Sequence, residues 1–224
     1  MSEGSTAKRT PRSKAEQRAE TLEQILDAAE YLFSKEGLNG VTLRDVAKRV
    51  GVHTTLLHYY FDDKRSLFEA VFARRASVTS GLRMAALERY EAEAGDHPTV
   101  EGALHAFLDT DLDLYITGGE PWKNYAAFCA RVSNTPEGGA LMDVHFDPVV
   151  LKLVSILRRA LPDHADEDIF WGYHFVTGAL MNTLARTERI DRLSSGLCHS
   201  DDFEAVKKRI ARFMAAGFMA LKGG

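Results

Sequence analysis

The stretch 42–72 constrains the fold of this chain more than any other, because it predicts two short helices joined by a tight turn and followed by a third helix. Thr42 and Asp45 have the spacing of a capping box, in which a hydroxyl at the N-cap and a carboxylate three residues later open a helix. Gly51 is expected to end that helix with a left-handed backbone. The next helix is too short to be stable alone, so it must dock on a core. The commonest task for the exposed face of such a helix is to enter the major groove of DNA.

The rest of the chain is expected to be helical as well, because apolar residues recur at helical spacing and no strand-like alternation is long enough for a sheet. We expect helices from Lys14 or Thr21 to Lys35, from Asp63 to about Tyr90, from Thr99 to a break at Thr117, from Trp122 to a break at Asn134, over Leu141–Leu161 with a kink or restart at Pro148, over Asp166–Arg186 and over Asp202–Lys222. The predicted fold class is all-α, with an N-terminal three-helix helix-turn-helix domain followed by a helical bundle.

Composition favours a cytoplasmic protein. The chain has 224 residues, of which 45% are apolar, enough for a sizeable core in one or two domains. It contains no apolar run of membrane-spanning length, and its N-terminus lacks the apolar stretch of a secretion signal. Cys129 and Cys198 have neither a disulfide nor a metal-site pattern, so no metal and no cofactor are expected.

Residues 20–77 resemble the DNA-binding domain of TetR-family transcriptional regulators, bacterial repressors that respond to small molecules. The family pattern is matched at Thr42, Leu43, Arg44, Ala47, Gly51, Val52, Leu57, Tyr60, Phe61 and Lys64. His53 and His58 depart from it, which leaves the operator sequence open. The resemblance implies a basic flexible arm over residues 1–19, a helix-turn-helix domain over 20–78, and a helical effector-binding and dimerisation domain over 79–224.

The resemblance also implies a set of contacts with a double-stranded DNA operator. Thr54, Thr55 and His58 would face the bases, since hydroxyl groups serve several bases and the threonine methyl can meet a thymine methyl. Phosphate contacts are expected from Tyr59, Tyr60, Lys64, Thr42 and Arg44, with a base contact left open as the alternative for Arg44.

The distribution of charge agrees with a DNA-binding N-terminal part, although the whole chain has a net charge of −4. Residues 1–75 carry 13 Lys and Arg against 11 Asp and Glu, whereas residues 76–224 carry 15 against 21. The N-terminal arm fits two interpretations equally. It either follows DNA phosphates or the minor groove, or it is a solubilising tail.

The central helices are expected to hold a small-molecule effector, because they combine many aromatic residues with polar residues in apolar surroundings. The candidate residues are Phe107, Asp111, Trp122, Tyr125, Phe128, His145, Trp171, His174, Phe175 and Asn182. Taken one at a time, these aromatic residues also fit an ordinary core. The family resemblance favours a pocket, with His174 as the polar anchor.

The last two helices are expected to form a homodimer interface. The helix from Asp166 is apolar nearly all round, and the final helix has one wide apolar stripe. We assign Gly178, Ile210, Phe213 and Gly217 to the interface. The alternative is packing within one chain, but the family resemblance implies dimerisation through two C-terminal helices.

The sequence contains no motif of an enzyme, such as a nucleophile elbow, a phosphate-binding glycine loop or a zinc-protease helix. We therefore expect a ligand-responsive repressor that acts as a homodimer, with no membrane partner. An architectural or activator DNA-binding protein without an effector remains the alternative.

Overall fold

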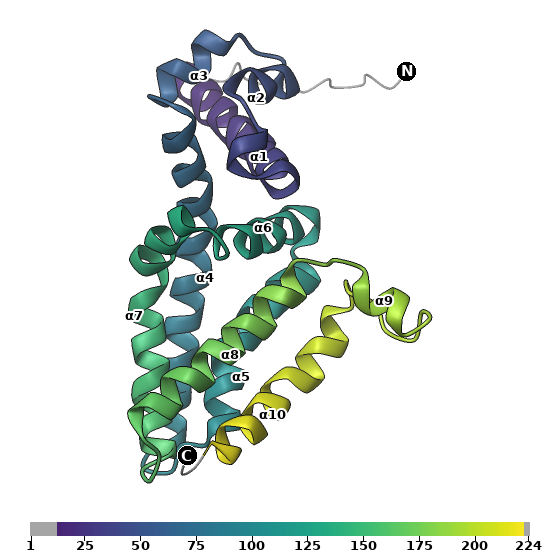
Figure 1. Cartoon of the computed structure of the whole chain (residues 1–224). Coiled ribbons are helices and arrows are strands. Elements are labelled where there is room, and N and C mark those ends of the chain that lie inside the picture. Colours follow the sequence, from purple (N-terminus) through teal and green to yellow (C-terminus); the bar gives the residue numbers. More distant parts are fainter. Residues whose placement is uncertain (1–12, 222–224) are drawn as a thin grey trace, which may run out of the picture.

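The computed structural model describes residues 13–221, and every regular element in this range is a helix (Figure 1). The helices in chain order are α1 (Lys14–Gly40), α2 (Leu43–Val50), α3 (Thr54–Tyr60), α4 (Lys64–Ala94), α5 (Val100–Thr117), α6 (Gly119–Val132), α7 (Pro136–Ala160), α8 (Asp166–Leu184), α9 (Arg189–Leu193) and α10 (Phe203–Ala220). The predicted all-α fold is confirmed for these residues. None of the helices in the described range is both long and apolar enough to cross a lipid bilayer.

The helix-turn-helix forms as the local sequence predicts. The Thr42 hydroxyl accepts a hydrogen bond from the Asp45 amide at 3.2 Å, and the Asp45 carboxylate accepts one from the Thr42 amide at 2.9 Å. Gly51 ends α2 with a φ of 81°, and its amide donates to the carbonyl of Ala47. A residue with a β-carbon is strained at that φ, so the tight turn towards α3 requires glycine there.

Helix α4 belongs to both halves of the molecule. It begins in the group formed by α1, α2 and α3 and continues down among the C-terminal helices (Figure 1). The expected domain boundary at residue 78 therefore falls inside a continuous helix.

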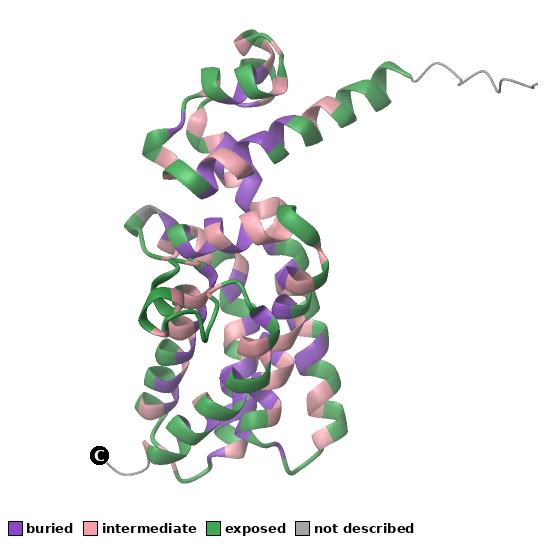
Figure 2. Cartoon of the chain, turned by 90° about the vertical axis from the view of Figure 1, so that its right-hand side faces the viewer, coloured by how far each residue is buried: buried purple, intermediate pink, exposed green. Residues whose placement is uncertain are grey.

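The C-terminal half is a bundle built around α4 and α5. Helix α5 packs along α4 and against α10, while α7 packs along another side of α4 and α8 contacts α6, α7 and α10. Buried residues lie along the inner sides of the helices in both halves, and the outer turns are exposed (Figure 2).

Several expected boundaries need correction. Helix α1 begins at Lys14, so the last part of the expected arm is helical, and residues 1–12 lie outside the described range. Helix α7 runs through Pro148 without a restart. Helix α8 ends at Leu184 rather than at Arg186, and the following segment, to which no helix was assigned from the sequence, contains the short helix α9. For the last helix, the expected end at Lys222 also lies outside the described range.

The capping box of α2 gives a first testable prediction. Thr42→Ala leaves the Asp45 amide without its acceptor, so we expect the free energy of unfolding to fall by about 0.5–2 kcal/mol. Urea unfolding followed by circular dichroism measures the change. Thr187→Ala, which truncates an exposed threonine in the segment after α8, serves as the control and is expected to change stability by less than about 0.5 kcal/mol. Equal losses in the two variants would contradict a capping role for Thr42.

Candidate functional site

Helix α3 is held by one buried side and presents the other side to solvent. Leu57 is fully buried in the core, whereas Thr55, His58 and Tyr59 are exposed. Thr54 is half-buried at the first position of the helix. This arrangement leaves hydroxyl and imidazole groups free on a rigid surface, as a major-groove reader requires.

The expected phosphate contacts surround this surface, with one difference. Thr42 and Arg44 are exposed on α2, and Lys64 is half-buried at the start of α4. The Tyr60 hydroxyl instead donates to the carbonyl of Arg18 at 3.3 Å, so in this conformation Tyr60 braces α3 against α1. The Arg18 guanidinium lies 5.9 Å from the ring centre of Tyr59, which adds a basic residue to the same surface.

Two carboxylates near this surface are used as helix caps. Hydrogen bonds from the Thr42 hydroxyl and amide lower the pKa of Asp45, and the backbone amide of Ser66 lowers the pKa of Asp63 in the same way. Both groups are therefore charged at neutral pH and point their oxygens at the amides of their own helices.

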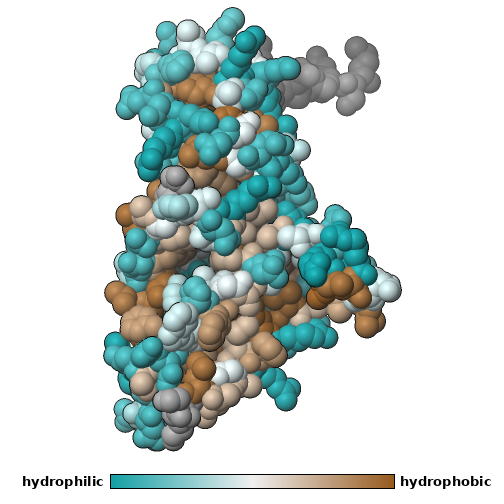
Figure 3. Space-filling view, in the orientation of Figure 1, coloured by the Kyte–Doolittle hydropathy of each residue, from teal (hydrophilic) through white to brown (hydrophobic). Residues whose placement is uncertain are grey.

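The outer surface of α8 and α10 is apolar. We call it the α8–α10 face and define it by Trp171, His174, Phe175, Gly178, Asn182, Phe213 and Gly217, all of which are exposed. Figure 3 shows apolar residues gathered over these two helices. Exposed contiguous apolar surface of this kind marks an interaction site. The face is not flat, because it contains a hollow of 190 Å³ between α8 and α10. The hollow is lined by Gly172, Phe175, Met214, Gly217, Phe218 and Leu221.

The α8–α10 face corrects two parts of the sequence interpretation. Trp171, His174, Phe175 and Asn182 were expected to line an internal effector pocket, but Trp171 is 51% exposed and stacks on Phe175 at the surface. The helices around α8 leave one side of it uncovered, where Phe170, Trp171 and Phe175 are exposed. Ile210, expected at the dimer interface, is only 7% exposed and belongs to the core.

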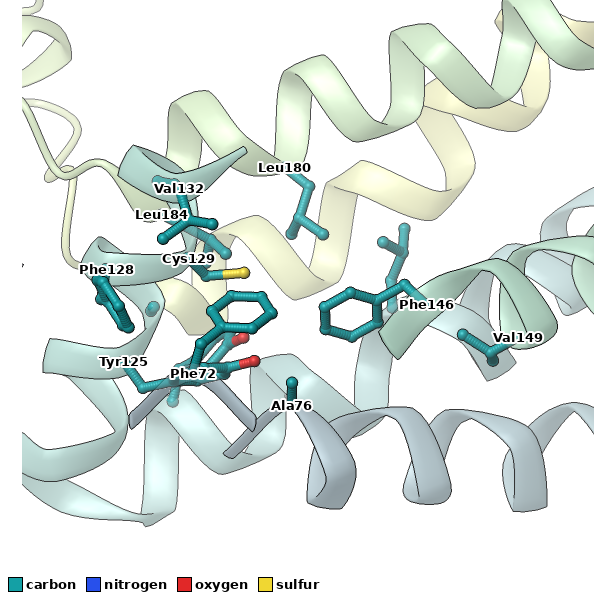
Figure 4. Close-up of a cluster of buried hydrophobic side chains, with 14 of the residues drawn as sticks. Phe72, Ala76, Tyr125, Phe128, Cys129, Val132, Phe146, Val149, Leu180 and Leu184 are labelled. Carbon is teal, nitrogen blue, oxygen red and sulfur yellow. The ribbon is translucent and has the colours of Figure 1, made fainter. Parts of the chain in front are cut away.

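The other candidates for effector binding are buried or half-buried in the interior. Tyr125 and Phe128 lie in the buried cluster of Figure 4, and Phe107 and Asp111 are buried on α5. His145 is half-buried with its ring 5.6 Å from that of Phe72. Trp122 is also half-buried, and the guanidinium of Arg75 lies 4.8 Å from its ring centre.

A buried ion pair lies in the middle of this interior, and only one of its two residues, Asp111, was among the predicted site residues. Arg83 on α4 is 5% exposed, and its Nη2 lies 2.8 Å from Oδ2 of Asp111 on α5. The Tyr115 hydroxyl donates to the same Oδ2 at 3.2 Å. The signal was present, because Arg83 continues the inward stripe of α4 that includes Ala76 and Thr79. A charged residue on such a stripe is rarely buried without a specific partner.

Burial is the largest influence on the pKa values of Asp111 and of the nearby Cys129. It raises the pKa of Asp111, with Arg83 opposing the shift, and it raises the pKa of the Cys129 thiol to about 12. Cys129 is therefore an uncharged thiol at neutral pH and an unreactive part of the core.

Aromatic residues and ion pairs join the two halves of the molecule. The Phe128 ring of α6 lies 6.1 Å from Phe33, 4.9 Å from Phe68 and 6.0 Å from Phe72. The Arg131 Nε donates to the carbonyl of Ser34 in α1 at 2.9 Å. Arg74 and Arg75 of α4 bind the buried carboxylate of Glu30 in α1. These contacts connect α1 to the C-terminal helices through α6 as well as through α4.

A groove of 820 Å³ lies beside this junction, between the end of α1, α6 and the segment after α8. Its lining includes Lys35, Glu120, Arg131, Arg192 and Asp201, all exposed and charged. Such a lining is unlike the mostly apolar wall of a typical small-molecule site. The effector candidates Phe107 and Asp111 lie elsewhere, in the buried interior beside Arg83.

Comparison with known proteins matches both halves of the chain. The sequence model described as "Bacterial regulatory proteins, tetR family" matches residues 25–71, and that of "Tetracyclin repressor-like, C-terminal domain" matches residues 105–217. The HTH-type transcriptional regulator BetI of Escherichia coli O157:H7 is 30% identical over 149 residues, which cover 66% of this chain and 74% of BetI.

Solved structures with low sequence identity share the fold. The fatty acid degradation regulator FadR from Bacillus halodurans matches with a TM-score of 0.53 and 14% identity, over 93% of this chain and 98% of FadR. A transcriptional regulator from Saccharomonospora viridis, solved in complex with choline, matches with a TM-score of 0.54 and 16% identity, over 88% of this chain and 96% of that protein.

Proposed function

Because this chain belongs to the TetR family of bacterial regulatory proteins, it is a DNA-binding transcriptional regulator, and we propose that it is a homodimeric repressor released from its operator by a small, largely apolar molecule. The observation that carries the proposal is helix α3, which is anchored by Leu57 and presents polar side chains on its free side. TetR regulators bind DNA operators and small-molecule effectors and act as dimers.

In this proposal the exposed residues of α3 read the operator. Thr55 and His58 contact base edges, with Thr54 at the start of the helix beside them. Thr42, Arg44, Tyr59 and Lys64 hold phosphates on either side and set the register. Tyr60 does not contact DNA in this proposal but holds α3 against α1 through its hydrogen bond to Arg18.

The α8–α10 face is the proposed dimer interface. Gly178, Phe213 and Gly217 are exposed on it, and the glycines allow the helices of a second copy to approach closely. A two-fold dimer places two copies of α3 about one turn of DNA apart, roughly 34–36 Å, as two half-sites require.

Effector binding is proposed in the interior of the C-terminal half. Phe107, Asp111, Tyr125 and Phe128 surround this region with Arg83. A ligand bound there contacts α4, which also carries Lys64 at its other end. A bound effector that favours a different position of α4 changes the spacing of the two DNA-binding domains and so lowers operator affinity. The Saccharomonospora viridis regulator was solved with choline, so choline is a necessary comparison compound in any effector test on this chain.

The alternative function is an activator or architectural DNA-binding protein that needs no effector. The two are separated by selecting the operator from random DNA and then titrating the protein–operator complex with a metabolite library. Release from one selected sequence by a particular compound supports the ligand-responsive repressor. Equal affinity for all DNA sequences, with no compound that changes this affinity, would support the architectural protein instead.

Two substitutions test the assignment of DNA contacts. Lys64→Ala is expected to weaken binding to all sequences alike and to reduce the slope of log K against log salt by about one, because one phosphate contact is lost. His58→Ala is expected to change the preferred bases, with an effect of about 1–3 kcal/mol at the position that His58 reads. Selection and salt titration of both variants measure these effects. A changed base preference in Lys64→Ala and an unchanged one in His58→Ala would reverse the assigned roles.

A further inference from the structure

Building on the proposed effector site, we propose that the effector is an uncharged molecule whose head group both accepts and donates hydrogen bonds, and that Arg83 excludes permanent cations. The ion pair between Arg83 and Asp111 and the aromatic rings around that pair carry this proposal.

The ion pair leaves hydrogen-bonding atoms unused on both partners. Among the described residues, Nε of Arg83 and Oδ1 of Asp111 are buried and have no hydrogen-bond partner. Both side chains are at least nine-tenths buried, so bulk water does not satisfy these atoms. Buried polar atoms in native proteins are nearly always paired, with protein, water or ligand. One unused donor next to one unused acceptor fits a head group that offers an acceptor and a donor, such as a carboxamide.

The aromatic surfaces that would hold a cationic ligand are already occupied by the protein's own cation. The guanidinium carbon of Arg83 lies 4.4 Å from the ring centre of Phe107 and 5.8 Å from that of Phe146. A quaternary ammonium group is recognised by such ring faces, and usually by a carboxylate nearby. Here Arg83 contacts the rings and also neutralises Asp111, so a second cation would meet a positive charge in a buried place.

An anionic ligand is disfavoured because it would meet the negative charge of Asp111. A carboxylate brought to Nε of Arg83 would lie close to Asp111, whose Oδ2 is 2.8 Å from the same guanidinium. Burial raises the pKa of Asp111, with Arg83 opposing the shift, and a second carboxylate beside it would lose its hydration in the same way. An uncharged head group uses the free atoms without adding an unpaired buried charge.

The ligand test uses four probes of similar shape and different charge. Choline is the cation and 3,3-dimethyl-1-butanol its uncharged carbon analogue, whose single hydroxyl oxygen both accepts and donates. 3,3-Dimethylbutanamide is the uncharged probe with its acceptor and its donors on separate atoms, and 3,3-dimethylbutanoate is the anion. Titration calorimetry with the purified full-length dimer measures binding, and fluorescence anisotropy of labelled operator measures release. We expect the amide to bind about tenfold or more tightly than either charged probe, with the alcohol between them.

Two variants are expected to change the selectivity in opposite directions. Arg83→Met frees the rings of Phe107 and Phe146 and leaves the Asp111 carboxylate unpaired, so this variant should gain choline binding. Asp111→Asn has nearly the shape of the original residue and leaves Arg83 unpaired, so it should gain binding of the butanoate. Arg158→Met removes the arginine of an exposed ion pair with Asp166 and serves as the control with unchanged selectivity.

The outcomes separate the ligand class from the function itself. Choline binding to the unaltered dimer as tight as amide binding would overturn the inference, and so would binding of none of the four probes. An unchanged probe order in Asp111→Asn would overturn it even if Arg83→Met failed to fold. A dimer that binds its operator and is released by some charged compound keeps the proposed function while the ligand class falls. A dimer with no preferred operator loses the proposed function.

Discussion

Phe213→Asp is expected to convert the proposed dimer into monomers and to lower operator affinity by about 10²–10⁴-fold. Phe213 is 73% exposed in the single chain and lies in the α8–α10 face, so a second copy would bury it. A carboxylate at that position would lose its hydration without gaining a partner. In a dimer, binding of one DNA-binding domain to its half-site raises the effective concentration of the other domain at the second half-site. Loss of this linkage lowers the affinity for the whole operator by about 10²–10⁴-fold.

Sedimentation velocity at micromolar concentration and anisotropy of a labelled operator measure both effects. Val144→Asp is a matched control, because Val144 is 72% exposed on α7 and lies outside the α8–α10 face. The control is expected to remain dimeric with unchanged affinity. A Phe213→Asp protein that stays dimeric and binds the operator as before would remove α10 from the interface.

Phe128→Ala is expected to lower the free energy of unfolding by about 3–5 kcal/mol, the usual cost of removing a buried phenylalanine ring. The ring is fully buried and lies against Phe33 of α1 and against Phe68 and Phe72 of α4. The cavity left behind would separate α6 from both helices. We therefore also expect weaker coupling between effector binding and operator release.

Urea unfolding gives the stability, and titration of the operator complex with effector gives the coupling. Phe170→Ala serves as the control, because the Phe170 ring is partly exposed on α8 and its loss leaves no enclosed cavity. A change of less than about 1 kcal/mol is expected there. If Phe128→Ala were as stable as this control, the aromatic junction would not hold the two halves of the molecule together.

The features that depend on neighbouring residues were predicted well. The capping box of Thr42 and Asp45 and the left-handed Gly51 lie within ten residues of one another, so local geometry alone decides them. The same applies to the long helix α4, whose start at Lys64 follows the cap formed by Asp63. Thr55 and His58 of α3 are exposed, while their role in reading DNA stays a prediction.

The predictions that failed depend on which helices meet. Helix α8 is apolar on several sides, and its sequence does not state which side faces the core of the same chain. His174 was therefore placed inside, although it is exposed, and Ile210 was placed outside, although it is buried. Arg83 was overlooked because its partner Asp111 lies on another helix.

The sequence by itself determined the helices, their caps and the helix-turn-helix, because hydrogen bonds and side-chain periodicity within one segment fix these features. Only the tertiary structure decided which apolar surfaces stay uncovered and which charged groups become buried partners. Both outcomes depend on packing between segments far apart in the chain, and burial changes the free energy of a charge far more than local sequence does. The α8–α10 face and the Arg83–Asp111 pair are the two products of that packing.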